Sequence, residues 1–270
     1  MNLGRSIEEL RLVPVNTCRL CHGQAKLCES HIIPEFFFKL SYDEKHRFRY
    51  TPNATTGRGP RIVQQGMTER LLCRTCEAKL SVFEGHAKKV LFDSKQFHRT
   101  LHPGGVIISG VNYTSFKLFL LSLLWRASVS VLEPFQLVKL GPHEETLRKM
   151  VLEEVPGGRF AYPTEFIICS DVPEELRHNI APPVTFRIET TRTYMFMFGN
   201  LFCNFYVSKN SRFLGAQSRT FLTEEGELPI HEDPYGLYKA WLADYISYVN
   251  GLHGQPSVST ATGLYKFRPL

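Results

Sequence analysis

The sequence lacks a long apolar run. Its longest largely apolar stretch, residues 116–125, is interrupted by Lys117 and Ser122 and is followed by Arg126. A helix needs about 20 apolar residues to cross a bilayer, so this stretch is too short for a membrane span. The first ten residues also lack the apolar segment of a secretory signal. We therefore expect a cytoplasmic protein without a membrane partner, in a compartment that keeps thiols reduced.

The second part of the chain lacks net positive charge. Residues 101–270 carry 15 Lys and Arg against 16 Asp and Glu, whereas residues 1–100 carry 17 against 10. Four thiolates around one zinc ion would lower the positive charge of the first part without reversing its sign. A positive surface attracts a polyanion, so this asymmetry favours a nucleic-acid partner for residues 1–100.

Four of the seven cysteines form two C-x-x-C pairs, Cys18 with Cys21 and Cys73 with Cys76. Each pair can place two thiolates on one metal ion, and two pairs complete the tetrahedral sulfur shell of a structural zinc site. In a reducing compartment, such pairs are better explained as zinc ligands than as disulfides. The other three cysteines lie in apolar segments, where we expect them to be buried packing residues: Cys28, Cys169 and Cys203.

The two pairs are 51 residues apart, and a histidine lies between them. Compact zinc motifs leave roughly 15–20 residues between pairs, so a real substructure must fit here. Residues 27–34 are apolar and β-branched, and they end at Pro34, which lacks a backbone donor. This pattern predicts a short strand that presents His31 near its end.

A helix is expected directly after the second cysteine pair. Within residues 77–92, apolar side chains recur at intervals of three and four: Leu80, Phe83, Ala87, Val90 and Leu91. A zinc-binding pair, a strand with a histidine, and a second pair that opens a helix form the order of a treble-clef, ββα-metal module. We expect this module to occupy residues 1–102.

Residues 15–90 resemble the HNH nuclease family. The resemblance lies in Cys18-Arg-Leu-Cys21, in the segment SHIIP at residues 30–34, and in residues 71–79, LLCRTCEAK. It implies a metal-dependent endonuclease that hydrolyses phosphodiester bonds, with DNA a better candidate than RNA. Chains of this kind are often bacterial, and some act in defence against foreign DNA.

The resemblance also implies the roles of three residues. His31 would be the general base that takes a proton from water, and Glu77 would help to hold a catalytic Mg²⁺ or Mn²⁺. Thr68 stands where the family has its middle asparagine. Two other positions depart from the family pattern: Ser30 replaces the acidic residue before the histidine, with Glu29 beside it, and Glu77 replaces the final histidine or asparagine.

Each of these residues has a plainer interpretation. His31 can be a packed or hydrogen-bonded histidine or a replacement zinc ligand, and Glu77 can be a carboxylate that complements the helix dipole. The turn-rich segment 50–61 contains Arg58 and Arg61. It can follow a phosphate backbone or be a solvated insertion.

The pattern of residues 103–270 predicts a second, α+β domain that begins after the His102-Pro-Gly-Gly105 turn. Residues 113–131 predict a helix that is apolar nearly all round and hence buried, and residues 142–155 predict a surface helix that begins with proline. Residues 199–200, Gly-Asn, predict a tight hairpin. The expected antiparallel strands span residues 164–170, 184–190, 193–198 and 201–207, and a closing helix and a mobile segment are expected at residues 235–249 and 251–263.

The sequence thus predicts an α+β protein with a zinc-stabilised nuclease module and a recognition or regulatory domain. The second domain is a candidate surface for a protein partner. Its strand aromatics could stack nucleic-acid bases but are better explained as core: Phe196, Phe198, Phe202, Phe205 and Tyr206. The alternative function is a non-catalytic zinc-stabilised module that binds nucleic acid or protein, and a third is a subunit active only within a larger complex.

Overall fold

The structure is a computed structural model of mixed helix and sheet. It describes residues 16–39, 42–50, 61–64, 66–93, 95–170, 179–188, 190–212, 219–233, 236, 238 and 268–269. This part of the chain contains four α-helices, a two-stranded sheet and a ten-stranded mixed sheet. The α+β prediction is confirmed at this level. The helices are α2 (Glu35–Lys39), α3 (Arg74–Phe92), α4 (Tyr113–Val129) and α5 (Pro142–Leu152), with a 3₁₀ turn, η2 (Glu133–Phe135).

The small sheet pairs β1 (Leu27–His31) with β4 (Thr68–Cys73) in antiparallel register. The expected strand around His31 is therefore present, and it ends before Pro34. Cys73 is both the last residue of β4 and the N-cap of α3. The helix predicted after the second cysteine pair is present and begins at Arg74. Four of its five apolar positions are buried: Leu80, Phe83, Ala87 and Val90.

The large sheet follows the order β3-β2-β8-β9-β10-β7-β11-β6-β5, and β12 pairs with β8. The four predicted strands pair antiparallel as expected, β7 with β10, β10 with β9 and β9 with β8, but the whole sheet is mixed, because β11 lies parallel to β7 and β2 lies parallel to β8. In both cases the partner strand comes from a distant part of the chain. The strands are β2 (Phe48–Tyr50), β3 (Arg61–Val63), β5 (His98–His102), β6 (Gly105–Ser109), β7 (Thr164–Ile168), β8 (Asn179–Ile188), β9 (Thr191–Phe198), β10 (Leu201–Tyr206), β11 (Glu227–Glu232) and β12 (Arg268–Pro269).

Two hairpins of this sheet have clear local causes. β9 and β10 pair directly across residues 199–200, as predicted, and Gly199 has the positive φ of 62° that such a turn needs. β5 and β6 pair across Pro103 and Gly104. Gly105 follows with a φ of 137°, and a Cβ there would lie 2.2 Å from the carbonyl oxygen of Ile230 in β11. Only glycine allows this close approach of the two strands.

The His102–Gly105 segment is therefore a hairpin turn within the large sheet. Strands of this sheet come from both sides of residue 102, with β2, β3 and β5 before it and β6 after it. One hydrophobic core also includes side chains from both parts of the chain. The division into domains 1–102 and 103–270 stays a prediction.

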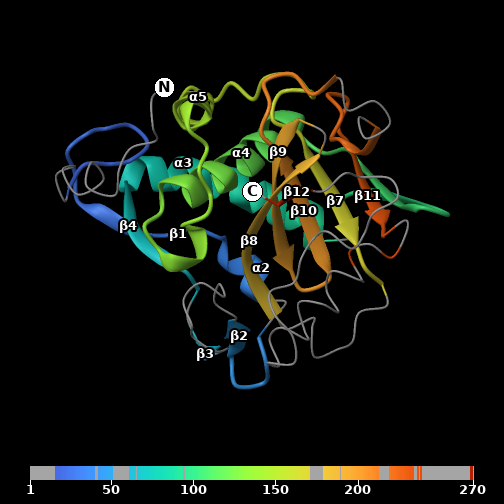
Figure 1. The fold of residues 1–270 in the computed structure, drawn as a ribbon, viewed down its shortest axis with the longest axis horizontal. Helices are drawn as coiled ribbons and strands as arrows, with labels where there is room; N and C mark the ends of the chain where they lie inside the picture. Colours follow the sequence, from blue (N-terminus) through green and yellow to red (C-terminus); the bar gives the residue numbers. More distant parts are fainter. Residues whose placement is uncertain are drawn as a thin grey trace.

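Helix α4 is the centre of the core. Thirteen of its residues are buried, in agreement with the nearly continuous apolar pattern. Figure 1 shows β9, β10, β7 and β11 side by side, with α3 and α4 between them and the β1–β4 pair. The five strand aromatics considered for base stacking are at most 1% exposed, as expected for core residues. Within the described residues, no helix is long and apolar enough to cross a membrane.

Three sequence predictions fall outside the described residues. They are most of the closing helix at residues 235–249, the mobile segment at 251–263, and the greater part of the arginine-bearing segment at 50–61. Its flanking strands β2 and β3 are described and pair with each other.

Candidate zinc centre and its surroundings

The two cysteine pairs meet at one point. The ligand atoms of Cys18, Cys21, Cys73 and Cys76 all lie within 4.8 Å of one another, and the sulfurs of Cys21 and Cys73 are 3.9 Å apart. In a tetrahedral site with Zn–S bonds of about 2.3 Å, sulfurs lie about 3.8 Å apart. All seven cysteines are free thiols. The four sulfurs therefore fit a metal ion such as zinc, and they form no disulfides.

Local structure brings each pair to the site. The Cys18 carbonyl accepts a hydrogen bond from the His22 amide at 2.9 Å, which closes a tight turn around the first pair. The amide of Arg19 donates to the carbonyl of Leu71 in β4, so this turn is attached to the strand that leads to Cys73. Cys76 follows in the first turn of α3. Three sulfur residues are buried and Cys21 is exposed.

The pKa values of three of these thiols are shifted in different directions. Burial raises the pKa of Cys18 and, more strongly, that of Cys76, where the negative charge of Cys18 adds to the effect. Burial also acts on Cys73, but hydrogen bonds from the Cys76 backbone and from the neighbouring thiols outweigh it, and the pKa of Cys73 is lowered. A bound zinc ion would stabilise all four thiolates and displace their protons.

Glu77, in the first turn of α3, lies beside Ser30 of β1. The Ser30 hydroxyl donates to Glu77 Oε2 at 2.6 Å, and Ser30 is fully buried. Successive residues of a strand point to opposite faces, so Ser30 faces α3 while His31 faces away from it. The structure therefore brings Glu77 to the residue before His31, and not to the imidazole itself.

His31 and Thr68 share the outer face of the small sheet. They are direct register partners in β1 and β4, and side chains of such partners lie on the same face. The imidazole is half-buried next to Gly66, where a Cβ would lie 3.1 Å from His31 Cδ2 and 3.2 Å from Phe38 Cε2. Glycine at position 66 thus allows the ring to lie against the backbone.

A buried arginine holds the backbone at His31. Arg126 in α4 is 1% exposed and donates from one guanidinium nitrogen to the His31 carbonyl oxygen at 2.7 Å. The same nitrogen lies 2.6 Å from Glu84 Oε1 in α3, an ion pair whose alignment is not that of a hydrogen bond. Arg126 therefore joins α4, α3 and the end of β1 at one point.

Arg126, Glu84 and Gly66 were not predicted from the sequence as parts of the site. Arg126 had a usable signal, because a charged residue in an otherwise buried apolar helix needs a polar partner. Gly66 had none. Cys28 is half-buried, whereas Cys169 and Cys203 are buried as predicted.

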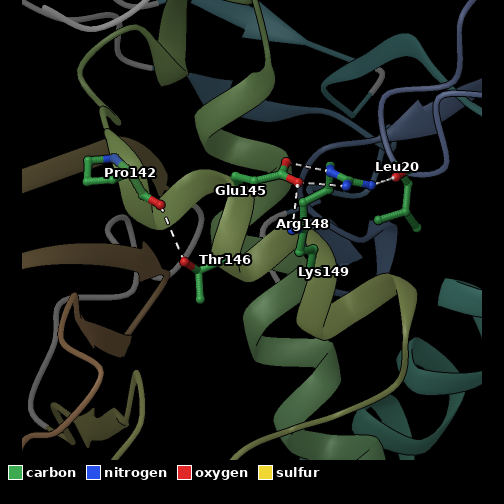
Figure 2. Close-up of polar contacts among 6 residues, drawn as sticks. All are labelled: Leu20, Pro142, Glu145, Thr146, Arg148 and Lys149. Carbon is green, nitrogen blue, oxygen red and sulfur yellow. Dashed lines mark hydrogen bonds and ion pairs between the residues drawn. The ribbon is translucent and has the colours of Figure 1, made fainter. Parts of the chain in front are cut away.

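Helix α5 adds a second attachment to the zinc-binding turn. Arg148 forms a bidentate ion pair with Glu145 in the same helix and also donates to the carbonyl oxygen of Leu20, between the first two cysteines (Figure 2). Lys79 of α3 donates to the carbonyl oxygen of Leu152 at 2.7 Å, at the end of α5. These contacts fix the zinc-binding turn and α3 against the same helix.

Comparison of the chain with protein-family models, with curated proteins and with solved structures found no match. Among the described residues, the four cysteines are the one group of three or more His, Cys, Asp or Glu side chains close enough to share a metal ion.

Proposed function

We propose that this chain is a metal-dependent HNH-type endonuclease that hydrolyses phosphodiester bonds of DNA. The observation that carries the proposal is the contact between Ser30 and Glu77, directly beside His31. It brings together the position before the histidine, where the family has an acidic residue, and the position after the last cysteine, where the family has histidine or asparagine and this chain has Glu77. The four-sulfur cluster fixes this arrangement from both sides.

The chemistry of these side chains fits the proposed reaction. Mg²⁺ retains several waters and is commonly held by one or two carboxylates together with substrate phosphates. Glu77, with the Ser30 hydroxyl, would hold such an ion, which when bound would offset the charge that develops on the phosphate. His31 would accept the proton of the attacking water through its imidazole. The Arg126 hydrogen bond to the His31 carbonyl would fix the backbone that carries this ring.

Plasmid cleavage tests the proposal. We expect purified protein to nick or linearise supercoiled DNA with Mg²⁺ or Mn²⁺, and His31→Ala to lower the rate by about 10²–10⁴-fold, the usual contribution of a general base. His98→Ala, at an exposed histidine in β5, is the matched control and should retain activity. Zinc content should be equal in all three proteins. Equal cleavage by His31→Ala would end the catalytic assignment.

A non-catalytic, zinc-stabilised nucleic-acid-binding module is the second candidate. Two observations favour it: Glu77 already accepts a hydrogen bond from Ser30, and the described residues contain no second group of three metal ligands. In a gel-shift assay this function predicts binding of the same DNA without a divalent ion, no product in its presence, and equal affinity for wild type and His31→Ala.

A further inference from the structure

A hollow of about 620 Å³ lies at the N-terminal end of α5, outside the site described above. Its walls come from the segment that leads into α5, from the turn between β8 and β9, and from the residues that follow β10. Pockets for small molecules usually measure about 300–1,000 Å³, so the volume suits a small ligand. Figure 2 shows Pro142 at this end of α5, with Arg148 farther along the helix, where it contacts Leu20 of the first cysteine turn.

Among the residues that the structure describes, the charged side chains that line this hollow are cationic: Arg187, Arg192 and Lys209. The two arginines donate to backbone carbonyl oxygens, Arg187 to that of Thr190 and Arg192 to that of Lys139, each at 2.8 Å. In the described part of the chain, none of the three cations forms an ion pair with a carboxylate. Each guanidinium has five N–H donors, so donors remain for an anion.

His143 adds a neutral polar group to the same wall. Its Nδ1 lies 2.9 Å from the Tyr162 hydroxyl, which leaves Nε2 as the ring nitrogen for a ligand. Burial lowers the pKa of His143, and the charges of Lys209 and Arg192 lower it further. His143, Arg192 and Lys209 line one hollow.

The end of helix α5 does not itself supply the site. The amide of His143 donates to the carbonyl oxygen of Leu140 at 3.2 Å, and the amide of Glu144 donates to that of Gly141 at 3.1 Å. The anion must therefore be recognised by the side chains of the surrounding elements. Guanidinium groups match the geometry of phosphate oxygens and can bind them with paired hydrogen bonds.

The positive lining does not continue unbroken into the neighbouring surface. A second hollow of about 550 Å³ shares Lys209 and Asn210 with the first, and it is lined by two arginines, Arg159 and Arg212, together with two carboxylates, Glu224 and Glu225. The opposite charges offset each other there, so the second hollow favours a polyanion less than the first does. A ligand confined to the first hollow avoids the carboxylates.

We propose that the hollow formed around Arg187, Arg192, Lys209 and His143 binds a small phosphorylated molecule through its phosphate group. The positive charge of the site suits a phosphomonoester, which carries about −1.5 to −2 at neutral pH, or a diphosphate. This site is separate from the proposed nuclease site, and it stands whether or not the chain cleaves DNA.

Isothermal titration of the full chain with pyrophosphate, inorganic phosphate and AMP tests this site. We expect saturable binding. Its Kd should rise by about tenfold or more in Arg187→Gln/Lys209→Gln, because this variant loses charge-assisted hydrogen bonds that contribute to the binding free energy. Lys209→Gln alone is a second variant that preserves the fold, since Lys209 is exposed and has no side-chain hydrogen bond in the described residues; it should weaken binding several-fold.

Two matched variants serve as controls. Lys88→Gln removes an exposed cation of α3, and Arg212→Gln removes a cation that lines only the second hollow. Both should bind as wild type does. Tighter binding of AMP than of pyrophosphate would uphold the site and assign it to organic phosphates, and the reverse order would uphold it for inorganic ones.

Three results would overturn the proposal. The first is the absence of binding by all three probes at millimolar concentration. The second is an equal loss in Lys88→Gln, which would indicate a general charge effect. The third is competition by a single-stranded oligonucleotide together with weaker binding in Arg212→Gln, which would indicate a polyanion track across both hollows.

Discussion

The zinc-binding region and the α4 core are stabilised by different forces. The first has a two-stranded sheet, which is marginal by itself, and four thiols gathered around one point. The second has a helix with thirteen buried residues against aromatic strands. A bound ion would fix the ends of a region with so little sheet of its own, whereas the α4 core is stabilised by burial of apolar surface. Arg126 and Glu84 connect the two.

Removal of a zinc ligand should give the largest difference in stability between the two regions. We expect Cys76→Ser to lose zinc and much of the order in β1, β4 and the start of α3, because structural zinc contributes about 10 kcal/mol or more to folding in small zinc domains. Zinc analysis and hydrogen exchange measure the two effects. Cys28→Ser is the control, since Cys28 lies in β1 outside the cluster, and it should retain one zinc ion. Protection lost equally in α4 would show that the regions are not distinct.

Loss of the connecting carboxylate should have the next largest effect. Glu84→Gln leaves Arg126 buried without its counter-charge, and such a change typically costs about 3–5 kcal/mol. Glu84 is partly exposed, so we expect the lower end of this range in urea unfolding. Glu84→Gln/Arg126→Met should recover part of the loss, because it removes the unpaired charge. A double variant as unstable as the single one would mean that the ion pair is not the connection.

The α4 core should show a pH dependence that the zinc-binding region does not explain. Burial lowers the pKa of Lys117 to about 7, while the unfolded chain keeps an ordinary lysine pKa near 10.4. The unfolded state thus binds more protons between these values, so the free energy of unfolding should rise by about 1 kcal/mol per pH unit across this window. Lys117→Met should lack this slope. If the free energy of unfolding rose equally with pH in wild type and in Lys117→Met, Lys117 would not be the group responsible.

A surface ion pair in the zinc-binding region should matter least. Arg70 Nε and Glu29 Oε1 are 2.8 Å apart, but both side chains are more than half exposed. Exposed pairs contribute about 0–1 kcal/mol, so Arg70→Gln should change the free energy of unfolding by about 0.5 kcal/mol or less. A loss comparable to that of Glu84→Gln would show that surface charge, and not the ion and the core, stabilises this region.

Local patterns predicted much of this fold. The spacing of Leu80, Phe83 and Val90 indicated the buried face of α3, and Gly199 with Asn200 indicated the β9–β10 hairpin, because both signals depend on neighbours in the chain. The short helix α2 was missed, since five residues are too few for a helical period to appear. The parallel pairings of β11 with β7 and of β2 with β8 were also missed, because no local signal specifies a distant strand partner.

The candidate site was predicted in part for the same reason. The spacing of two C-x-x-C pairs by itself indicates a metal site, so the sulfur cluster could be predicted from the sequence. The contact of Glu77 with Ser30, and the orientation of His31 toward Thr68 and Gly66, depend on strand register and on which face meets α3. The role of Arg126 depends on how α4 crosses the end of β1, which no pattern in the sequence specifies.

X-ray absorption at the zinc edge of the purified chain is the decisive measurement for the four-sulfur site. We expect one zinc ion per chain with four sulfur neighbours at about 2.3 Å. Fewer than four sulfurs in the zinc shell, or a chain that contains no zinc and carries disulfides at Cys18, Cys21, Cys73 and Cys76, would contradict this expectation.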